Sequence, residues 1–397
     1  MVSPTPGSQS SLREANEQRV LRSLLAHGAQ TQADIARRTG LSPATVSNIV
    51  RDLRTAGAVE VTPVAGRRRA VRVSLARSTG VVVGIDFGHR HLRVAVADLS
   101  HTVLAETSEQ LDVDHSATEG LRIAVALIDR LLAEAGADRD EVVGVGMGVP
   151  GPIDTTTGAV GSSSILPGWV GLDPAATLRE ALDRPVHVDN DANLGALGEA
   201  AWGAGRGHGD VAYIKAATGV GAGLLLGGRL YRGRAGTAGE IGHTTIDENG
   251  DVCRCGNRGC LETYVGTPML LSLLRRSHGQ ELTLRDVLRL ATDGDVGCRR
   301  VIADAGRYIG VAVANLCNLL SPELVIVGGD LAAAGDLLLQ PLRDAVRRYA
   351  IPSAAHAMRV VPGELGERAE VLGALALALR RSEAHLVDDA LGAITVG

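Results

Sequence analysis

The 397-residue chain lacks the long apolar runs of a membrane protein and has only five cysteines. No run reaches the roughly eighteen consecutive apolar residues that indicate a transmembrane helix. The N-terminus, Met1 to Ser10, has Ser, Pro and Gly where a signal peptide would have an apolar core. We therefore expect a cytoplasmic protein without a membrane partner. In that reducing compartment the cysteines are available as metal ligands rather than disulfides, and Cys317 is expected to be a buried apolar residue.

Length and charge predict more than one domain. A chain of 397 residues, 45% of them hydrophobic, exceeds what one core usually holds, so two or three domains are expected. Residues 1–76 contain eleven arginines and five acidic residues, a formal charge of +6, whereas the remainder carries −11 of the total of −5. A small basic module on a larger acidic body suggests that nucleic acid binds at one end.

The basic module has the pattern of a winged helix-turn-helix. Gly40 and Leu41 form the turn, Ser42 is placed as the N-cap of the third helix, and Pro43 is its first residue. Thr31 can cap the second helix. The expected helices and strands lie at 11–26, 31–38, 43–56, 59–64 and 71–75.

The third helix has a short, polar outward face opposite its apolar stripe, as expected for a recognition helix in a major groove. An arginine-rich tip between the two strands resembles a wing that reaches phosphates or a minor groove. The alternative is a solvated amphipathic three-helix segment with a basic loop. The predicted DNA contacts are Thr31, Pro43, Ala44, Thr45, Ser47, Asn48, Arg51, Arg67, Arg68 and Arg69.

After Thr79 the pattern changes to buried strands that alternate with helices. Strands are expected at Gly80–Asp86, Leu92–Asp98 and Val142–Met147, with a helix at Gly120–Ala135. This alternation predicts an α/β architecture.

Three cysteines fall within eight residues, ten residues after a histidine. Thiolates and an imidazole suit a tetrahedral zinc ion, and four protein ligands would make the site structural. Gly256 and Gly259 can form the tight turns that such convergence needs. A chance cluster of reduced thiols is the alternative. A DNA-binding zinc finger is disfavoured because a second histidine at finger spacing is lacking and the cluster lies in the acidic part. The predicted ligands are His243, Cys253, Cys255 and Cys260.

Five motifs follow one another in the second part of the chain: Gly148–Asp154, Val188–Asn193, Ala217–Gly223, Glu240–His243 and Cys253–Glu262. In this order they resemble the ROK family of repressors, open reading frames and sugar kinases. The resemblance spans about residues 80–380 and implies a two-lobed fold of the actin and hexokinase kind. Members with an N-terminal winged helix resemble sugar-responsive repressors, whereas members without one are mostly kinases.

Together, the patterns and the resemblance predict a domain plan. It comprises a flexible tail at 1–10, the winged helix at 11–76, a linker at 77–80 and the ROK domain at 81–381. Within that domain we expect a hinge near 190–200 and a C-terminal helix near 369–381 that returns to the first lobe. Residues 382–397 form a tail without an interpretable motif.

By the same resemblance, a sugar binds at Asn190, Asp191, Glu240, His243 and Glu262. Amide, carboxylate and imidazole groups suit a polyol, because directed hydrogen bonds recognise its hydroxyls. Asp191 would be the catalytic base if the protein were a kinase. The plainer interpretation of the motif around Asp191 is a polar turn before a helix.

The motif that would bind the phosphates of ATP differs from the pattern of the family's kinases. Family kinases open with Asp-x-Gly-Gly-Thr, whereas here His89 and Arg90 follow Gly88. Ile165 also stands where kinases often have a sugar-binding Asn. An ATP and magnesium site is therefore only weakly indicated; its candidate residues are Asp86, Gly88, Thr218, Gly219, Gly221, Gly328 and Gly329.

The first hypothesis is a homodimeric repressor, or a dimer of dimers, that binds double-stranded operator DNA and responds to a sugar or sugar phosphate. The second is an ATP-dependent sugar kinase, or a bifunctional protein, that uses Asp191. A transcriptional activator is the third hypothesis, because the sequence of a DNA-binding module does not show whether the protein activates or represses transcription.

Overall fold

The computed structural model describes residues 9–64, 71–111, 117–154, 158, 160 and 167–396. Its first part is a winged helix built from three helices and a three-stranded antiparallel sheet of order β1-β3-β2. The pairing strand β1 was not predicted. The elements are α1 (Gln9–His27), β1 (Gln30–Thr31), α2 (Gln32–Thr39), α3 (Pro43–Thr55), β2 (Val59–Pro63) and β3 (Val71–Leu75).

Local capping explains where the helices of the winged helix begin. Thr31 is the N-cap of α2 and forms a capping box with Asp34. Ser42 is the N-cap of α3, and its side chain accepts a hydrogen bond from the Thr45 amide at 3.1 Å. Pro43 is in the first turn, where its missing N–H costs nothing. The three predicted helices are confirmed. The predicted wing arginines, Arg67 to Arg69, lie outside the described residues.

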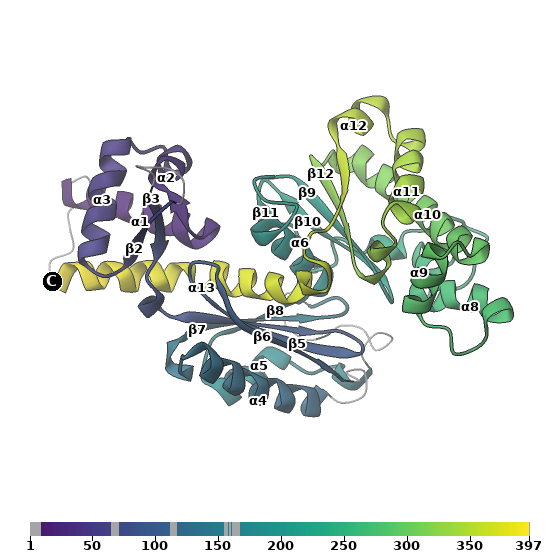
Figure 1. Cartoon of the computed structure of the whole chain (residues 1–397), viewed down its shortest axis with the longest axis horizontal. Coiled ribbons are helices and arrows are strands. Elements are labelled where there is room, and N and C mark those ends of the chain that lie inside the picture. Colours follow the sequence, from purple (N-terminus) through teal and green to yellow (C-terminus); the bar gives the residue numbers. More distant parts are fainter. Residues whose placement is uncertain are drawn as a thin grey trace.

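The first lobe follows a short 3₁₀ turn at Arg77–Thr79. Its five-stranded sheet has the order β6-β5-β4-β7-β8, with β4, β7 and β8 parallel and β5 and β6 antiparallel. Helices α4 and α5 pack an apolar core against one face (Figure 1). The elements are β4 (Val81–Phe87), β5 (His91–Asp98), β6 (Val103–Gln110), α4 (Ala117–Ala135), β7 (Val142–Val149), α5 (Pro174–Leu182) and β8 (Val186–Asn190).

The second lobe has another five-stranded sheet, of order β11-β10-β9-β12-β13. Helix α6 connects the lobes and packs on β9 and β10. The elements are α6 (Asp191–Trp202), β9 (Val211–Ala216), β10 (Val220–Leu226), β11 (Arg229–Leu230), α7 (Glu262–Val265), α8 (Thr267–His278), α9 (Leu284–Thr292), α10 (Val296–Leu320), β12 (Leu324–Gly328), α11 (Asp336–Tyr349), α12 (Pro352–Ala357) and β13 (Arg359–Pro362).

The C-terminal helix is longer than predicted. Helix α13 spans Ala369–Val396, so the helix predicted to end near Arg381 continues through the segment taken as a tail. No proline follows Arg381, and Ala and Leu, both strong helix formers, recur there. In Figure 1, α13 runs between the winged helix and the first lobe. Leu372, Leu375 and Leu379 share one core with α1, α3 and the first sheet.

Among the residues that the structure describes, no helix combines the length and the apolarity needed to span a membrane.

Candidate ligand cleft and metal centre

A cavity of about 750 Å³ is lined by residues of both lobes. All five predicted sugar residues line it: Asn190, Asp191, Glu240, His243 and Glu262. So do six of the seven candidate nucleotide residues: Gly88, Thr218, Gly219, Gly221, Gly328 and Gly329. The seventh, Asp86, is buried beside the cavity at 1% exposure. The fold therefore gathers these residues, which lie far apart in the sequence, around one cavity.

The start of α6 projects polar groups into this cavity. Asn190 is the N-cap of α6; its Oδ1 accepts from the Ala192 amide at 2.9 Å, and its Nδ2 donates to the Gly151 carbonyl at 3.0 Å. Asp189 behind it is buried and forms a hydrogen bond of 2.8 Å with Arg232 Nε. These contacts hold the first turn of α6 in place, so the neighbouring Asp191 is presented on a rigid element.

Asp191 is paired with Lys215, the only lysine among the 40 Lys and Arg residues of the chain. The Lys215 Nζ atom lies 2.9 Å from Asp191 Oδ2 and 3.3 Å from Glu370 Oε1. Burial lowers the pKa of Lys215, but the carboxylates of Asp191, Glu370 and Asp86 outweigh burial and raise it above its usual value. Lys215 is therefore charged at neutral pH. This ammonium therefore compensates the negative charge of Asp191 and occupies its Oδ2 atom.

The remaining polar side of the cavity comes from the segment around the cysteines. Arg254 lies between two of them in sequence, and its Nε is 2.8 Å from Glu262 Oε1. Glu262 Oε2 also accepts from the Val220 amide at 3.2 Å. Burial raises the pKa of Glu240, whose Oε2 is 3.9 Å from His243 Nε2. The cysteine segment thus contacts Glu262 through Arg254, and the candidate ligand His243 lies near Glu240.

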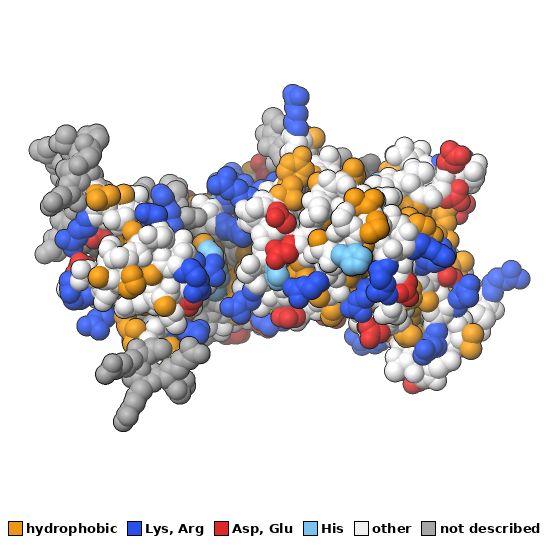
Figure 2. All heavy atoms as spheres, turned by 90° about the horizontal axis from the view of Figure 1, so that it is seen from above, with side chains coloured by type: hydrophobic (Ala, Val, Ile, Leu, Met, Phe, Trp, Pro, Cys, Tyr) orange, Lys and Arg blue, Asp and Glu red, His pale blue; other side chains and the backbone are white. Residues whose placement is uncertain are grey.

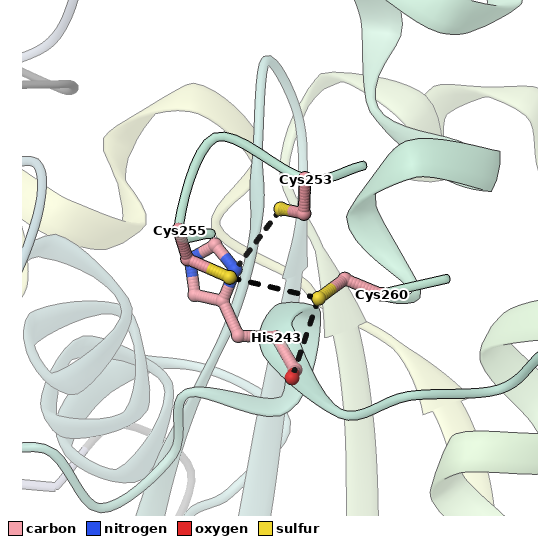
Figure 3. Close-up of side chains that lie close together, drawn as sticks. All are labelled: His243, Cys253, Cys255 and Cys260. Atoms are coloured by element: carbon pink, nitrogen blue, oxygen red, sulfur yellow. Dashed lines mark hydrogen bonds between the residues drawn. The ribbon is translucent and has the colours of Figure 1, made fainter. Parts of the chain in front are cut away.

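The four predicted metal ligands converge, as Figure 3 shows, with all ligand atoms within 4.8 Å of one another. A tetrahedral zinc ion with ordinary bond lengths would place two sulfurs about 3.8 Å apart and a sulfur and a nitrogen about 3.6 Å apart. Cys255 Sγ and Cys260 Sγ are 3.7 Å apart, and Cys253 Sγ is 3.6 Å from His243 Nδ1. The donor set could therefore hold a metal ion, and these two distances match those of a tetrahedral zinc site.

Two glycines allow this convergence. Gly256 has φ +91° and Gly259 has φ +63°, in the left-handed region that side chains disfavour. A Cβ on Gly259 would also lie 1.6 Å from the Asp247 carbonyl oxygen. The turn before Cys260 therefore requires glycine, as predicted from the sequence.

The first phosphate loop differs from an open phosphate-binding loop. The His91 ring lies so close to Gly88 that a Cβ on Gly88 would be 2.1 Å from His91 Cε1. His91 Nε2 is 2.9 Å from Asp86 Oδ2, and Arg93 is 3.7 Å from the same oxygen. The His91 imidazole therefore occupies the space beside Gly88, where the backbone would have to approach the phosphates of a nucleotide.

The predicted DNA contacts of α3 lie on one face. Its apolar residues Val46, Ile49 and Val50 are buried. Thr45 is half-buried and hydrogen bonds with Ser42, whereas Thr31 uses its hydroxyl to cap α2. Figure 2 shows several basic side chains around the winged-helix end of the molecule. The other predicted residues of α3, Pro43, Ala44, Ser47, Asn48 and Arg51, are exposed.

Three site residues were not predicted from the sequence: Lys215, Arg254 and His91. Lys215 had a usable signal, since it is a single charge within the otherwise apolar run Val211–Ala216 and the only lysine in the chain. Arg254 and His91 had no comparable signal, because the loop and strand geometry bring them to Glu262 and Asp86, which are eight and five residues away in the sequence.

Two family models match the chain. The model described as the ROK family matches residues 82–381, and one described as the MarR family matches residues 15–70. A xylose repressor of Caldicellulosiruptor bescii is 30% identical over 389 residues, which cover 94% of this chain and 97% of that protein. A glucokinase of Thermotoga maritima is 30% identical over 316 residues and matches 76% of this chain and 98% of its own length.

Solved structures agree with both comparisons. A ROK family transcriptional regulator described as a homologue of the Escherichia coli Mlc protein has a TM-score of 0.75 at 25% identity and covers 97% of this chain and 100% of its own. A ROK family glucokinase from Streptomyces griseus, solved with glucose and AMPPNP, has a TM-score of 0.65 at 30% identity and covers 76% of this chain and 100% of its own. The two-lobed α/β fold with an N-terminal winged helix is thereby confirmed. This chain belongs to the ROK family.

Proposed function

We propose that the protein is a sugar-responsive transcriptional repressor. The observation that carries this proposal is the winged helix joined to a ROK domain in one chain, an arrangement matched along 97% of a protein named xylose repressor. The glucokinase relative matches only 76% of the chain. A kinase has no use for a recognition helix, whereas a repressor needs both a DNA-binding module and a ligand site.

The cleft supplies the ligand site of this proposal. Glu240, His243 and Glu262 line one side and the start of α6 lines the other, so a sugar placed between them would meet directed acceptors and donors from both lobes. A ligand that contacts both lobes favours one lobe arrangement over others, and it shifts the equilibrium only by its difference in affinity. Pentoses and hexoses are the first candidates.

Zinc would serve as a scaffold. His243 Nδ1 faces the cysteines, while Nε2 of the same ring faces Glu240 and the cavity, so one side chain belongs to both sites. A bound metal would stabilise the loop that carries Arg254 toward Glu262. The ion would then hold the sugar-binding groups in position without taking part in any chemical step.

An ATP-dependent sugar kinase is the second candidate, favoured by the glucokinase relatives and by Asp191. Two contacts oppose it: Lys215 neutralises Asp191, and His91 fills the space beside Gly88. Sugar-dependent release of ADP that disappears in Asp191→Ala would support this candidate; no release from a zinc-loaded, sugar-binding preparation would exclude it.

We further propose that a homodimer binds two operator half-sites with its two α3 helices, separated by about one turn of DNA or a multiple of it. Exposed Asn48 and Arg51 are suited to adenine and guanine edges. The wing arginines would add contacts to the backbone or minor groove.

The experiment is a gel-shift titration. Duplexes are first selected by the full-length protein from a random library, then titrated with and without D-xylose, D-glucose and their phosphates. We expect specific binding that at least one sugar weakens. A complete lack of sequence-specific binding with or without sugars contradicts the proposal, and stronger binding with sugar identifies an activator or corepressed regulator instead.

A further inference from the structure

Three parts of the molecule meet at one residue, His101, in the turn between β5 and β6. Its ring Nε2 donates a hydrogen bond to the Leu25 carbonyl of α1 at 2.7 Å, so it holds the winged helix. Its main-chain carbonyl accepts a hydrogen bond from Trp202 Nε1, at the end of α6, at 2.9 Å. The His101 and Trp202 rings also pack with centroids 5.1 Å apart. First lobe, second lobe and winged helix therefore share one hydrogen-bonded junction.

The conformation of His101 suits this role. Its φ of +69° lies in the left-handed region, which is uncommon for a residue other than glycine and needs support from its surroundings. Burial lowers the pKa of the ring, so the imidazole is neutral and has one N–H. A carbonyl can only accept, so that N–H goes to Leu25. The Leu25 carbonyl is among the last of α1, which have no partner inside the helix.

The end of α1 lies in direct contact with the same turn. Gly28 follows α1 with φ +64°, and a Cβ there would lie 2.8 Å from the Ser100 carbonyl oxygen. Ser100 Oγ donates to the Leu75 carbonyl at the end of the wing strand β3, at 2.9 Å. The turn and the winged helix are therefore also in contact beside His101.

Helix α6 connects this junction to the cleft. Its N-terminus presents Asp191 to the cavity, and its C-terminus is Trp202, 12 residues in all. At about 1.5 Å per residue the helix spans about 18 Å. Its backbone touches α13, because a Cβ on Gly198 would be 2.2 Å from the Ala369 carbonyl oxygen. Because α6 is one continuous helix, a shift of its start would also displace its end at Trp202.

We propose that the contacts from Trp202 to His101 to Leu25 carry the ligand signal from the cleft to the DNA-binding domain, with His101 as the positioning residue. This inference rests on the proposed repressor function. When a sugar draws the lobes together at the start of α6, the far end of α6 shifts against the β5–β6 turn. His101 transfers that shift to the C-terminal end of α1. Because α1 packs against α2 and α3, the recognition helix is reoriented.

The test measures how strongly a sugar changes the affinity for the operator, and not only whether each ligand binds. Contacts between residues do not by themselves prove that a signal passes through them. Trp202→Phe removes the indole N–H and keeps an aromatic ring. His101→Asn removes the donor to Leu25 and keeps a side chain that tolerates positive φ. Ser100→Ala is the matched control, because it removes a hydrogen bond from the same turn to the winged helix, and Ser100 forms no hydrogen bond with α6 among the described residues. Sugar affinity is measured by calorimetry with D-xylose and D-glucose, and operator affinity with the selected duplex.

The expected wild-type ratio of operator Kd with and without sugar is about 5 to 150. We expect that ratio to fall to within about twofold of 1 in Trp202→Phe and His101→Asn, while the sugar Kd and the zinc content stay within about twofold of wild type. Ser100→Ala should keep most of the wild-type ratio. Full coupling in both junction variants overturns the inference and leaves the repressor function intact.

A second measurement does not depend on the response to sugar. The chain has two tryptophans, so Trp169→Phe leaves Trp202 as the only indole fluorophore. We expect the emission of Trp202 to change when the selected duplex binds, even without a sugar. If no sugar alters operator affinity, the proposed function fails; if duplex binding leaves Trp202 emission unchanged, the junction does not move and the inference fails.

Discussion

At the residue scale, the candidate metal cluster and the cleft share His243, so the proposed function predicts a ligand response that depends on metal. Cys255 is the exposed member of the cluster and contacts Cys260 Sγ at 3.7 Å. We expect Cys255→Ser to lose zinc and to lose the sugar response together, because the loop that carries Arg254 toward Glu262 is no longer held. Zinc is measured by elemental analysis and the sugar response by gel shift.

The control for that variant is Cys317→Ala, which removes a buried thiol outside the cluster. It should keep both zinc and sugar response, although the lost packing lowers stability. A Cys255→Ser protein that binds no zinc but responds fully to sugar would show that the metal does not support the ligand site.

Lys215 offers the second test at this scale. Its side chain is 16% exposed and lies between Asp191 and Glu370. Lys215→Met should lower the free energy of unfolding by about 3–5 kcal/mol, because removing one partner leaves a buried charge without compensation. Chemical denaturation at neutral pH measures this.

The triple variant Lys215→Met/Asp191→Asn/Glu370→Gln is the matched comparison, because Glu370 also faces Lys215, at 3.3 Å. Removing the three charges together should recover much of the lost stability, since replacing all partners of a buried ion cluster is often nearly neutral. Equal losses in the single and triple variants would mean that the contacts of Lys215 with these two carboxylates are not the stabilising interactions.

At the element scale, α3 combines a buried apolar side with an exposed polar one. Asn48 is exposed in the N-terminal half of the helix. Asn48→Ala should weaken binding to the selected duplex by about 1–3 kcal/mol and relax the preference at one base pair, because a bidentate contact to a base edge is lost. Binding to unrelated DNA should stay the same.

The matched variant is Gln280→Ala, which removes an exposed amide from the second lobe. It should leave operator affinity unchanged. If Asn48→Ala behaves like Gln280→Ala, base recognition lies elsewhere, and the wing arginines become the next candidates.

At the scale of the whole molecule, the cleft joins two lobes that are otherwise connected through α6, α13 and Lys215. A sugar that binds only the folded protein should raise its stability, by about 2.7 kcal/mol at a concentration of 100 times Kd. Thermal unfolding with D-xylose, D-glucose and their phosphates measures this shift.

Glu262→Gln should abolish the stabilisation by sugar, since Glu262 is held in the cavity by Arg254 and the Val220 amide. ATP with magnesium should add nothing to the wild-type protein, because His91 fills the space beside Gly88. Stabilisation by ATP alone would revive the kinase hypothesis.

Features that depend on neighbouring residues were predictable from the sequence. The helices of the winged helix were found from the caps Thr31 and Ser42, and the metal cluster from three cysteines and two glycines within a short loop. Capping and loop turns are local, so the chain encodes them over a few residues. The family resemblance then related the distant motifs to one ligand site.

Features that depend on long-range packing needed the tertiary structure. Lys215 pairs with Asp191 and Glu370, and His101 joins Leu25 to Trp202, across separations that no spacing rule covers. The extension of α13 was missed because no motif marks residues beyond Arg381. The sequence by itself determined the helix caps, the candidate metal donors and the polar groups that line the cleft. Only the folded chain decided which charges neutralise one another and which elements meet at a junction, because those choices depend on distances between segments far apart in the chain.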